Sequence, residues 1–216
     1  MLYLDISPPV HHTTAVFPGD TPFSLVWTMH RDRGDTCSVS AMTLSPHVGA
    51  HVDAPYHVLH ESESADAARR VGDLGLQPFI GPCRVVSSEN SQPITRDVVN
   101  GWPLEGVERV LVRTRPHVDP TVFPRDGAYF TADGAAALAG RVLLVGLDTA
   151  SVDHWESQDL PAHRALFAGG SAILEGVDLS AVVPGDYELI ALPLRLADAD
   201  ASPVRAVLRV LEPAPA

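Results

Sequence analysis

Four side chains that can bind a metal ion crowd into residues 45–57, which read Ser-Pro-His-Val-Gly-Ala-His-Val-Asp-Ala-Pro-Tyr-His. They are His47, His51, Asp53 and His57. Divalent transition metals accept both imidazole and carboxylate groups as ligands. Neither a hydrophobic core nor a solvated surface requires such a density of these groups. The stretch therefore predicts a metal site with an acid/base group beside it.

The spacing of these residues favours a bent, extended segment over a helix. His47 and His51 stand one helical turn apart, like the paired histidines of helical zinc proteases, but Val48 replaces the glutamate of that motif. Gly49 and two prolines also disfavour a helix. Side chains at even offsets along a strand project to the same face, so an extended segment would let all four polar groups converge.

Length and charge limit what the chain can be. With 216 residues it can bury a sizeable core, and we expect a single domain over residues 1–216. The net charge of -12 disfavours nucleic acid and anionic membranes as partners, because both attract basic surfaces. No apolar run reaches the length of a membrane span, and the first residues lack the features of a signal peptide. We therefore expect a cytoplasmic enzyme that acts on a small molecule.

Strands and helices alternate in the prediction for the rest of the chain. Apolar or alternating patterns predict strands, and hydroxyl N-caps with terminal glycines predict short helices. The expected strands cover residues 2–6, 38–44, 78–86, 107–114, 141–147, 187–194 and 202–211, and the expected helices cover residues 61–70, 95–101, 131–140 and 160–167. This alternation predicts an α/β fold with a mixed sheet.

Three residues outside the histidine stretch have types and positions that suit a site. Phe17 lies in a stiff loop and could form the aromatic wall of a pocket, although packing in the core is the commoner role of an aromatic residue. Asp148 ends a buried strand, where α/β sheets bind ligands, and a turn aspartate would explain it equally well. Glu175 interrupts an apolar run, so it is expected either to bind a cation or to form a salt bridge.

Sequence blocks along nearly the whole chain form a recognisable pattern. They are Asp5-Ile-Ser-Pro-Pro, Phe17-Pro-Gly-Asp-Thr-Pro, His47-Val-Gly-Ala-His-Val-Asp-Ala-Pro-Tyr-His, Gly146-Leu-Asp-Thr, Ala162-His163, Ile173-Leu-Glu-Gly, Gly185-Asp-Tyr-Glu-Leu-Ile-Ala-Leu-Pro-Leu and Asp200-Ala-Ser-Pro-Val-Arg-Ala-Val-Leu. With these blocks the chain resembles the bacterial kynurenine formamidases of the cyclase-like metal hydrolases. The central block is specific for the superfamily, and the flanking blocks point to the formamidase branch.

The resemblance implies a binuclear zinc site. His47, His51 and Asp53 would hold one zinc ion, and Asp53 would bridge to a second ion that His163 and Glu175 complete. Manganese and iron suit the same ligands, so the identity of the metal stays open.

The resemblance also implies roles for His57, as the acid/base, and for Phe17, as the aromatic residue against the ring of the substrate. The implied fold is a single cyclase-like α/β domain with a mixed, barrel-like β-sheet of the swivelling β/β/α type and peripheral helices. Such domains usually assemble as homodimers, so a homodimer is expected.

The implied reaction is hydrolysis of N-formyl-L-kynurenine to L-kynurenine and formate, in the kynurenine pathway of tryptophan degradation. Two alternatives stay open: a hydrolase or cyclase acting on another small aryl amide or lactam such as isatin, and a metal-binding or ligand-binding protein without turnover. Residues 151–158, Ser-Val-Asp-His-Trp-Glu-Ser-Gln, lack a lysine that family members often carry there and gain a bulky His-Trp pair. If this segment borders the pocket, we expect it to affect substrate preference.

Overall fold

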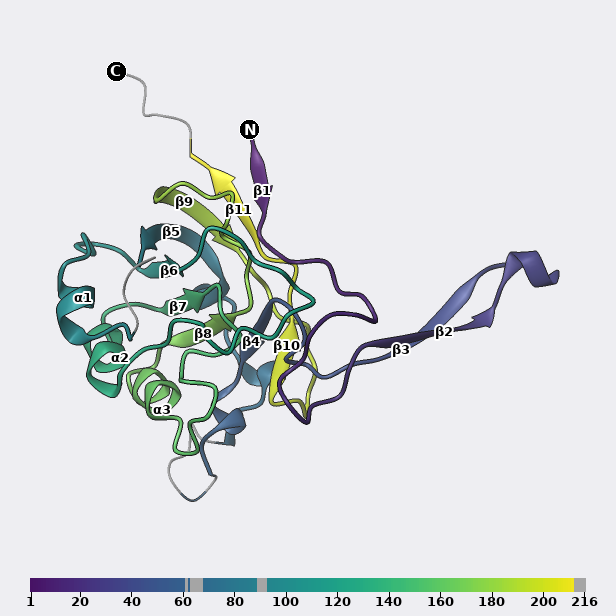
Figure 1. Cartoon of the computed structure of the whole chain (residues 1–216), viewed down its shortest axis with the longest axis horizontal. Coiled ribbons are helices and arrows are strands. Elements are labelled where there is room, and N and C mark those ends of the chain that lie inside the picture. Colours follow the sequence, from purple (N-terminus) through teal and green to yellow (C-terminus); the bar gives the residue numbers. More distant parts are fainter. Residues whose placement is uncertain (61, 63–67, 89–92, 212–216) are drawn as a thin grey trace.

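A sheet of nine strands forms the body of the protein (Figure 1). The computed structural model describes residues 1–60, 62, 68–88 and 93–211. The strands follow the spatial order β1-β11-β9-β5-β6-β7-β8-β4-β10. Their bounds are β1 Tyr3–Asp5, β4 His51–Asp53, β5 Ile80–Ser87, β6 Arg109–Arg113, β7 Leu144–Leu147, β8 Ala172–Glu175, β9 Gly185–Ile190, β10 Ala201–Pro203 and β11 Val207–Val210.

The middle of the sheet is parallel and both sides are antiparallel. Strands β5, β6, β7 and β8 pair in parallel. Parallel neighbours need crossover connections, and each of the three crossovers carries one helix: α1 (Arg96–Asn100), α2 (Ala132–Leu138) and α3 (Pro161–Ala168). The helices lie together on one side of the sheet (Figure 1). Thr131 caps α2 by accepting a hydrogen bond from the N–H of Gly134 at 3.2 Å, as its position before the helix predicts.

The sheet separates two hydrophobic cores. Alternate residues of a strand point to opposite faces, so Val110 and Val112 of β6 pack with the helices whereas Leu111 packs into the second core. The second core also contains Val52 of β4 and Leu208 of β11. Strands so far apart in the spatial order can share one core only if the sheet curls around it. The mixed, barrel-like sheet with peripheral helices is therefore confirmed as a curled half-barrel.

A two-stranded arm projects away from the body (Figure 1). It pairs β2 (Ser24–Met29) with β3 (Val39–Thr43) in antiparallel register. Several of its apolar side chains face solvent, and Val26 and Met42 keep 60% and 66% of their surface exposed. The strand expected over residues 38–44 is confirmed as β3, but it belongs to this arm and not to the main sheet.

The bent, extended segment predicted over residues 45–57 is extended only at its centre. Only β4 (His51–Asp53) is a strand; a turn precedes it, and a short 3-10 helix over Pro55–His57 follows it. Proline at the first position of that helix presets the backbone angle of a helical turn. Residues 202–211 likewise form parts of two strands, β10 and β11, and not one. Most of the helix expected over residues 61–70 lies outside the described residues. In the described part of the chain, no helix is long and apolar enough to cross a membrane.

Candidate metal centre

Pairing of β4 with β8 brings predicted ligands together inside the protein. His51 lies directly opposite Glu175 in the antiparallel register, and Asp53 follows on the same side of β4. His51, Glu175 and Asp53 expose only 2%, 3% and 1% of their surface. The register of two strands thus places three polar side chains at one buried point.

His47 reaches the same point from the turn before β4. Gly49 in this turn has a φ of 69°, and Gly176 approaches it so closely that a Cβ on Gly176 would lie 2.3 Å from the Gly49 oxygen. The Gly49 carbonyl accepts a hydrogen bond from Nδ1 of His51 at 3.0 Å. That bond leaves Nε2 of His51 facing the carboxylates, the arrangement in which a histidine binds a metal.

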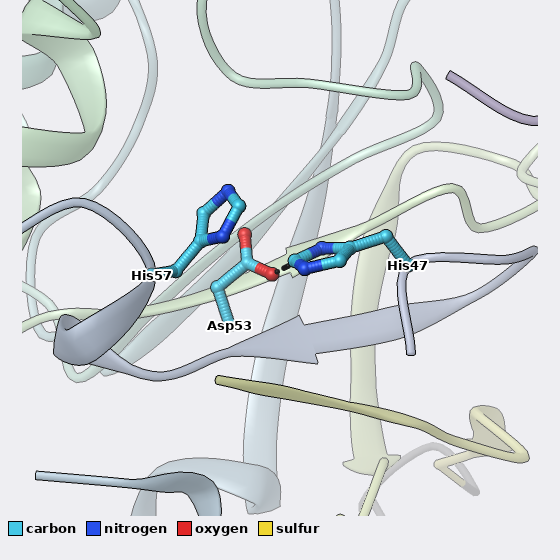
Figure 2. Close-up of side chains that lie close together, drawn as sticks. All are labelled: His47, Asp53 and His57. Carbon is cyan, nitrogen blue, oxygen red and sulfur yellow. Dashed lines mark ion pairs between the residues drawn. The ribbon is translucent and has the colours of Figure 1, made fainter. Parts of the chain in front are cut away.

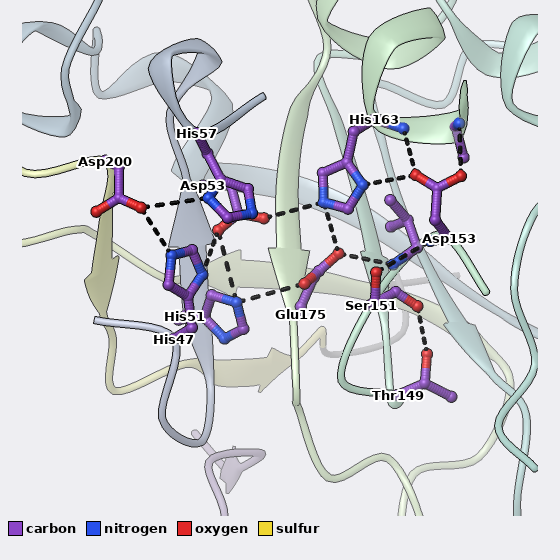
Figure 3. A network of polar contacts seen from close by, with 12 residues as sticks. His47, His51, Asp53, His57, Thr149, Ser151, Asp153, His163, Glu175 and Asp200 are labelled. Atoms are coloured by element: carbon purple, nitrogen blue, oxygen red, sulfur yellow. Dashed lines mark hydrogen bonds and ion pairs between the residues drawn. The ribbon is translucent and has the colours of Figure 1, made fainter. Parts of the chain in front are cut away.

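His163 arrives from the first turn of α3, and Asp153 holds it there. The Asp153 carboxylate accepts hydrogen bonds from the backbone N–H groups of Ala162 and His163, at 2.8 and 3.0 Å. It also bonds Nδ1 of His163 at 2.7 Å. A carboxylate on one ring nitrogen orients the imidazole, and Nε2 of His163 consequently points to Asp53 and Glu175 (Figure 3).

We call these five residues the histidine–carboxylate cluster: His47, His51, Asp53, His163 and Glu175. Oδ1 of Asp53 lies 3.1 Å from Nδ1 of His47 and 3.5 Å from Nε2 of His51. Oδ2 of Asp53 lies 3.4 Å from Nε2 of His163. Oε2 of Glu175 lies 3.3 Å from Nε2 of His51, and Oε1 lies 3.3 Å from Nε2 of His163. Each carboxylate therefore faces histidines on both sides of the cluster.

The donor set of the cluster fits a divalent metal. Nε2 of His51 and both carboxylate oxygens of Asp53 are buried and have no partner in hydrogen-bonding geometry among the described residues. Leaving such polar atoms unsatisfied in the interior is costly, and a cation between them removes that cost. Imidazole nitrogens and carboxylate oxygens together suit zinc, manganese and iron.

Charges within the cluster shift its pKa values in opposite directions. Burial raises the pKa of Asp53, but the neighbouring histidines, His51 first, lower it to well below its usual range. Burial lowers the pKa of His47, but Asp200 and Asp53 outweigh this and raise it to about 10. Protons on the histidines therefore balance the carboxylates when no metal is bound, and metal binding must release them.

His57 lies beside the cluster and is bonded to an acid outside it. Its Nδ1 lies 3.2 Å from Oδ2 of Asp200, which also lies 3.0 Å from Nε2 of His47. The N–H of Ala54 donates to the backbone oxygen of Asp200 at 2.8 Å, which fixes Asp200 beside the turn that carries His57. Hydrogen bonds from the two histidines hold the pKa of Asp200 well below its usual range. His47 and His57 flank Asp53 (Figure 2), with donor atoms of all three within 4.8 Å of one another.

A cavity of about 340 Å³ opens onto the cluster, within the size range of small-molecule sites. Phe17 lines it and stays 39% exposed, so this residue is not packed into the core. The Phe17 ring meets Phe123 edge to face, with ring centroids 5.2 Å apart. Leu160 and Val118 add further apolar lining. The lining thus has an apolar, aromatic part and a polar part, which we call the apolar and polar ends of the cavity.

Asp148 organises the edge of the cavity and makes no hydrogen bond to the cluster in the described part of the chain. Its carboxylate accepts bonds from the N–H of Thr114 at 2.8 Å and from the Thr114 hydroxyl at 2.5 Å. Its backbone oxygen accepts a bond from Nε of Arg115 at 3.0 Å. These bonds tie the ends of β6 and β7 together where both border the cavity.

The divergent segment 151–158 reaches the cavity in part. Ser151 and Ser157 line it. Trp155 instead packs against Phe123, with ring centroids 6.3 Å apart, and His154 packs against Tyr129 at 4.9 Å. Trp155 therefore packs directly on Phe123, and His154 contacts Phe123 only indirectly, through Trp155.

The structure brings the predicted site residues together. His47, His51, Asp53, His57, His163 and Glu175 meet at the polar end of the cavity, and Phe17 lines the same cavity. Asp153 and Asp200 contact the predicted histidines, although their sequence positions assign them no role. Asp153 lies ten residues before His163 and is not next to the start of the predicted helix, so no capping signal identifies it. No local signal identifies Asp200, which lies 143 residues from His57 along the chain.

Comparisons with known proteins identify the family of the chain. The Cyclase family model matches residues 4–154. A kynurenine formamidase of Bacillus mycoides (strain KBAB4) is 42% identical over 208 residues, covering 96% of this chain and 97% of that protein. The kynurenine formamidase of Bacillus anthracis is 41% identical over the same shares of the two chains.

Solved structures share the fold at lower identity. Isatin hydrolase A from Labrenzia aggregata, bound to benzyl benzoate, superposes with a TM-score of 0.82 at 22% identity, covering 98% of this chain and 94% of its own. A "predicted metal-dependent hydrolase" from Bacillus stearothermophilus superposes with a TM-score of 0.78 at 23% identity, covering 96% of this chain and 97% of its own.

Proposed function

The chain belongs to the Cyclase family, and on that premise we propose that it is a metal-dependent kynurenine formamidase. The reaction is hydrolysis of the formamide bond of N-formyl-L-kynurenine, which yields L-kynurenine and formate in tryptophan degradation. The observation that carries this proposal is the 42% identity to a kynurenine formamidase over 96% of the chain. The expected cytoplasmic location stays a prediction.

The histidine–carboxylate cluster is proposed to hold two zinc ions. His47, His51 and Oδ1 of Asp53 face one side, which suits one ion. His163 and Oδ2 of Asp53 face the other side, which suits a second ion. Glu175 supports both positions, because each of its oxygens faces a different histidine. Bound zinc would supply Lewis-acid polarisation of the formyl oxygen and would lower the pKa of water at the site.

His57 is proposed to move the proton that the reaction requires. Hydrolysis transfers a proton from the attacking water to the aryl nitrogen, because an arylamine is a poor leaving group as an anion. A neutral imidazole has one ring nitrogen that can accept a proton and then donate it, which suits this transfer. Asp200 bonds Nδ1 of His57. The other ring nitrogen, Nε2, is therefore the one proposed to accept and donate the proton.

The apolar end of the cavity suits the aryl ring of the substrate. Phe17 and Phe123 offer an aromatic wall, and aromatic rings favour the edge-to-face and offset contacts available there. The formyl group is small, so it needs little space at the polar end. Placing the ring on the wall would bring the formamide to the cluster.

Hydrolysis of N-formyl-L-kynurenine by purified protein tests the proposal. Kynurenine and formate should form in equal amounts in the presence of zinc. Isatin belongs in the same assay as the alternative substrate, although isatin hydrolases at 20–22% identity support only a shared fold. Turnover of isatin in preference to the formamide would contradict the proposal, and so would metal-loaded protein with no hydrolytic activity.

We also propose that two copies assemble through the arm formed by β2 and β3. Exposed apolar side chains on a projecting two-stranded element favour a protein–protein contact. Replacing Val26 and Met42 together by serine should convert a dimer into a monomer in sedimentation experiments. A wild-type monomer at micromolar concentration would contradict this assembly.

A further inference from the structure

Arg115 is the one arginine or lysine that lines the cavity in the part of the chain that the structure describes. The other charged residues on its lining, apart from histidines, are acids: Asp20, Asp119, Asp148 and Glu175. The whole chain carries a net charge of -12. Away from the histidine–carboxylate cluster, Arg115 is therefore the cationic side chain that can receive a negatively charged group in this cavity.

The guanidinium of Arg115 is held in place from one edge. Nε donates to the backbone oxygen of Asp148 at 3.0 Å, and Nη2 donates to the same oxygen. Both bonds go to a neutral carbonyl, because the Asp148 carboxylate is turned toward Thr114. Nη1 makes no hydrogen bond among the described residues. The end of the guanidinium thus stays available for a second, charged acceptor.

Arg115 has no ion-pair partner among the described residues, unlike other arginines of the chain. Arg84 pairs with Asp186, and Arg205 pairs with Asp5. Arg115 is partly buried, and this burial lowers its pKa. The charges of Asp148 and Asp178 oppose this shift, but neither acid forms an ion pair with the guanidinium. An anion that enters the cavity could therefore form the direct, charge-assisted contact that Arg115 lacks.

We propose that Arg115 binds the α-carboxylate of the substrate while the aryl formamide lies against the histidine–carboxylate cluster. This inference rests on the proposed function. N-formyl-L-kynurenine carries its amino-acid side chain on the ring carbon next to the formamide, so ring, formamide and carboxylate form three separated features. The cavity offers one counterpart to each: an aromatic wall, the cluster and the guanidinium. Arg115 is a specificity-determining residue in this arrangement.

Three substrates separate carboxylate recognition from a structural role of Arg115. N-formyl-L-kynurenine has the full side chain, N-formylkynuramine lacks only the carboxylate, and formanilide lacks the whole side chain. Arg115→Gln should lower kcat/KM for N-formyl-L-kynurenine about 10- to 100-fold, the range of a charged hydrogen bond, mainly through KM. For the other two substrates the change should stay within about twofold. Arg115→Lys should recover part of the loss, because lysine keeps the positive charge but cannot form the two parallel hydrogen bonds that a guanidinium makes to a carboxylate.

Arg125→Gln provides a matched control. Arg125 stacks over Trp155 at 4.8 Å and does not line the cavity. It should therefore leave the ratio of kcat/KM values between the substrates unchanged. Equal losses on all three substrates in Arg115→Gln would show a structural role and overturn the proposal. No loss on N-formyl-L-kynurenine would also overturn it.

The wild-type protein gives a test that does not depend on folding of a variant. It should prefer N-formyl-L-kynurenine over N-formylkynuramine by about 10-fold or more in kcat/KM, the same range as above. Hydrolysis of both at equal efficiency would contradict the role of Arg115 and leave the formamidase proposal standing. Failure to hydrolyse any of the three would instead contradict the proposed function itself.

Discussion

The two ends of the cavity are built in different ways. At the polar end, β4, β8 and β10 set the positions of His51, Glu175 and Asp200 through strand register and backbone hydrogen bonds. At the apolar end, Phe17, Phe123 and neighbouring residues come from connecting segments outside the strands and helices. The cluster acids expose no more than 3% of their surface, whereas Phe17 exposes 39%.

This difference separates the chemistry of the site from its choice of substrate. A side chain on a buried strand cannot move without disturbing the core, so the cluster keeps its geometry. Connecting segments tolerate changes in sequence and length, so the wall can vary while the cluster stays the same.

The largest expected effect comes from Asp53→Asn in the cluster. This change keeps the size of the side chain but removes the charge that faces both sides of the cluster. Bound metal should be lost, and turnover should fall to background. Elemental analysis and kinetics measure both. Asp119→Asn, at the wall, is the matched control and should retain its metal. Full metal content in the Asp53→Asn protein would contradict the proposal that the cluster binds the metal and the wall binds the substrate.

His57→Ala should lower kcat by about 10²- to 10⁴-fold, the usual contribution of a general acid–base group. Metal content should not change, because His57 is proposed to transfer protons and not to bind zinc. Elemental analysis alongside kcat distinguishes the two roles. Loss of metal would show that His57 is a ligand, which its distance of less than 4.8 Å from donors of His47 and Asp53 permits. Unchanged turnover would exclude either role.

Asp153→Asn should weaken metal affinity by about 10- to 100-fold, the usual effect of losing a carboxylate that orients a metal-bound histidine. The physical reason is its 2.7 Å contact with Nδ1 of His163. Competition with a chelator measures the affinity. Asp133→Asn is a suitable control, since Asp133 lies in the first turn of α2 and bonds Thr131. Equal metal affinities for the two variants would contradict the role of Asp153.

Phe17→Ala should raise KM by about 3- to 10-fold with little change in kcat, because an aromatic contact contributes about 0.5–1.5 kcal/mol. Steady-state kinetics with N-formyl-L-kynurenine measures both constants. A loss confined to kcat would place Phe17 at the reacting group, and would remove the distinction between the wall and the cluster.

A further expected effect concerns the stability of the metal-free protein. The pKa of His47 is raised from 6.5 to about 10, so its protonated form stabilises the fold fully below about pH 6.5. That stability is lost as the pH rises through about 10. The Tm of chelated protein should therefore fall across this window, and added zinc should remove most of the fall. An equal fall of Tm with pH in the presence and absence of zinc would contradict this link between His47 protonation and metal binding.

Much of the cluster could be predicted from sequence because its members are dense and chemically distinctive. His47, His51, Asp53 and His57 lie within eleven residues, and Glu175 is an acid in an apolar run. The way they converge could not be predicted, because β4 is only three residues long and a 3-10 helix follows it. Periodicity along a strand does not indicate where a bent segment turns.

Contacts between distant segments account for the rest. Asp200 meets His57 only because β10 pairs with β4, and that pairing leaves no trace in either short sequence. Arg115 lies just beyond the end of β6 and donates a hydrogen bond to the backbone oxygen of Asp148, just beyond the end of β7. The arm escaped prediction in part because β2, unlike a core strand, is exposed at five of its six residues.

Zinc titration of metal-free protein, with turnover of N-formyl-L-kynurenine as the readout, tests the central claim most directly. The claim is that the buried cluster is a binuclear metal centre of a kynurenine formamidase. Turnover should be absent without metal, rise with added zinc and saturate at about two ions per chain, and Asp53→Asn protein should stay inactive throughout. Full turnover without metal, or none at saturating zinc, would contradict the account.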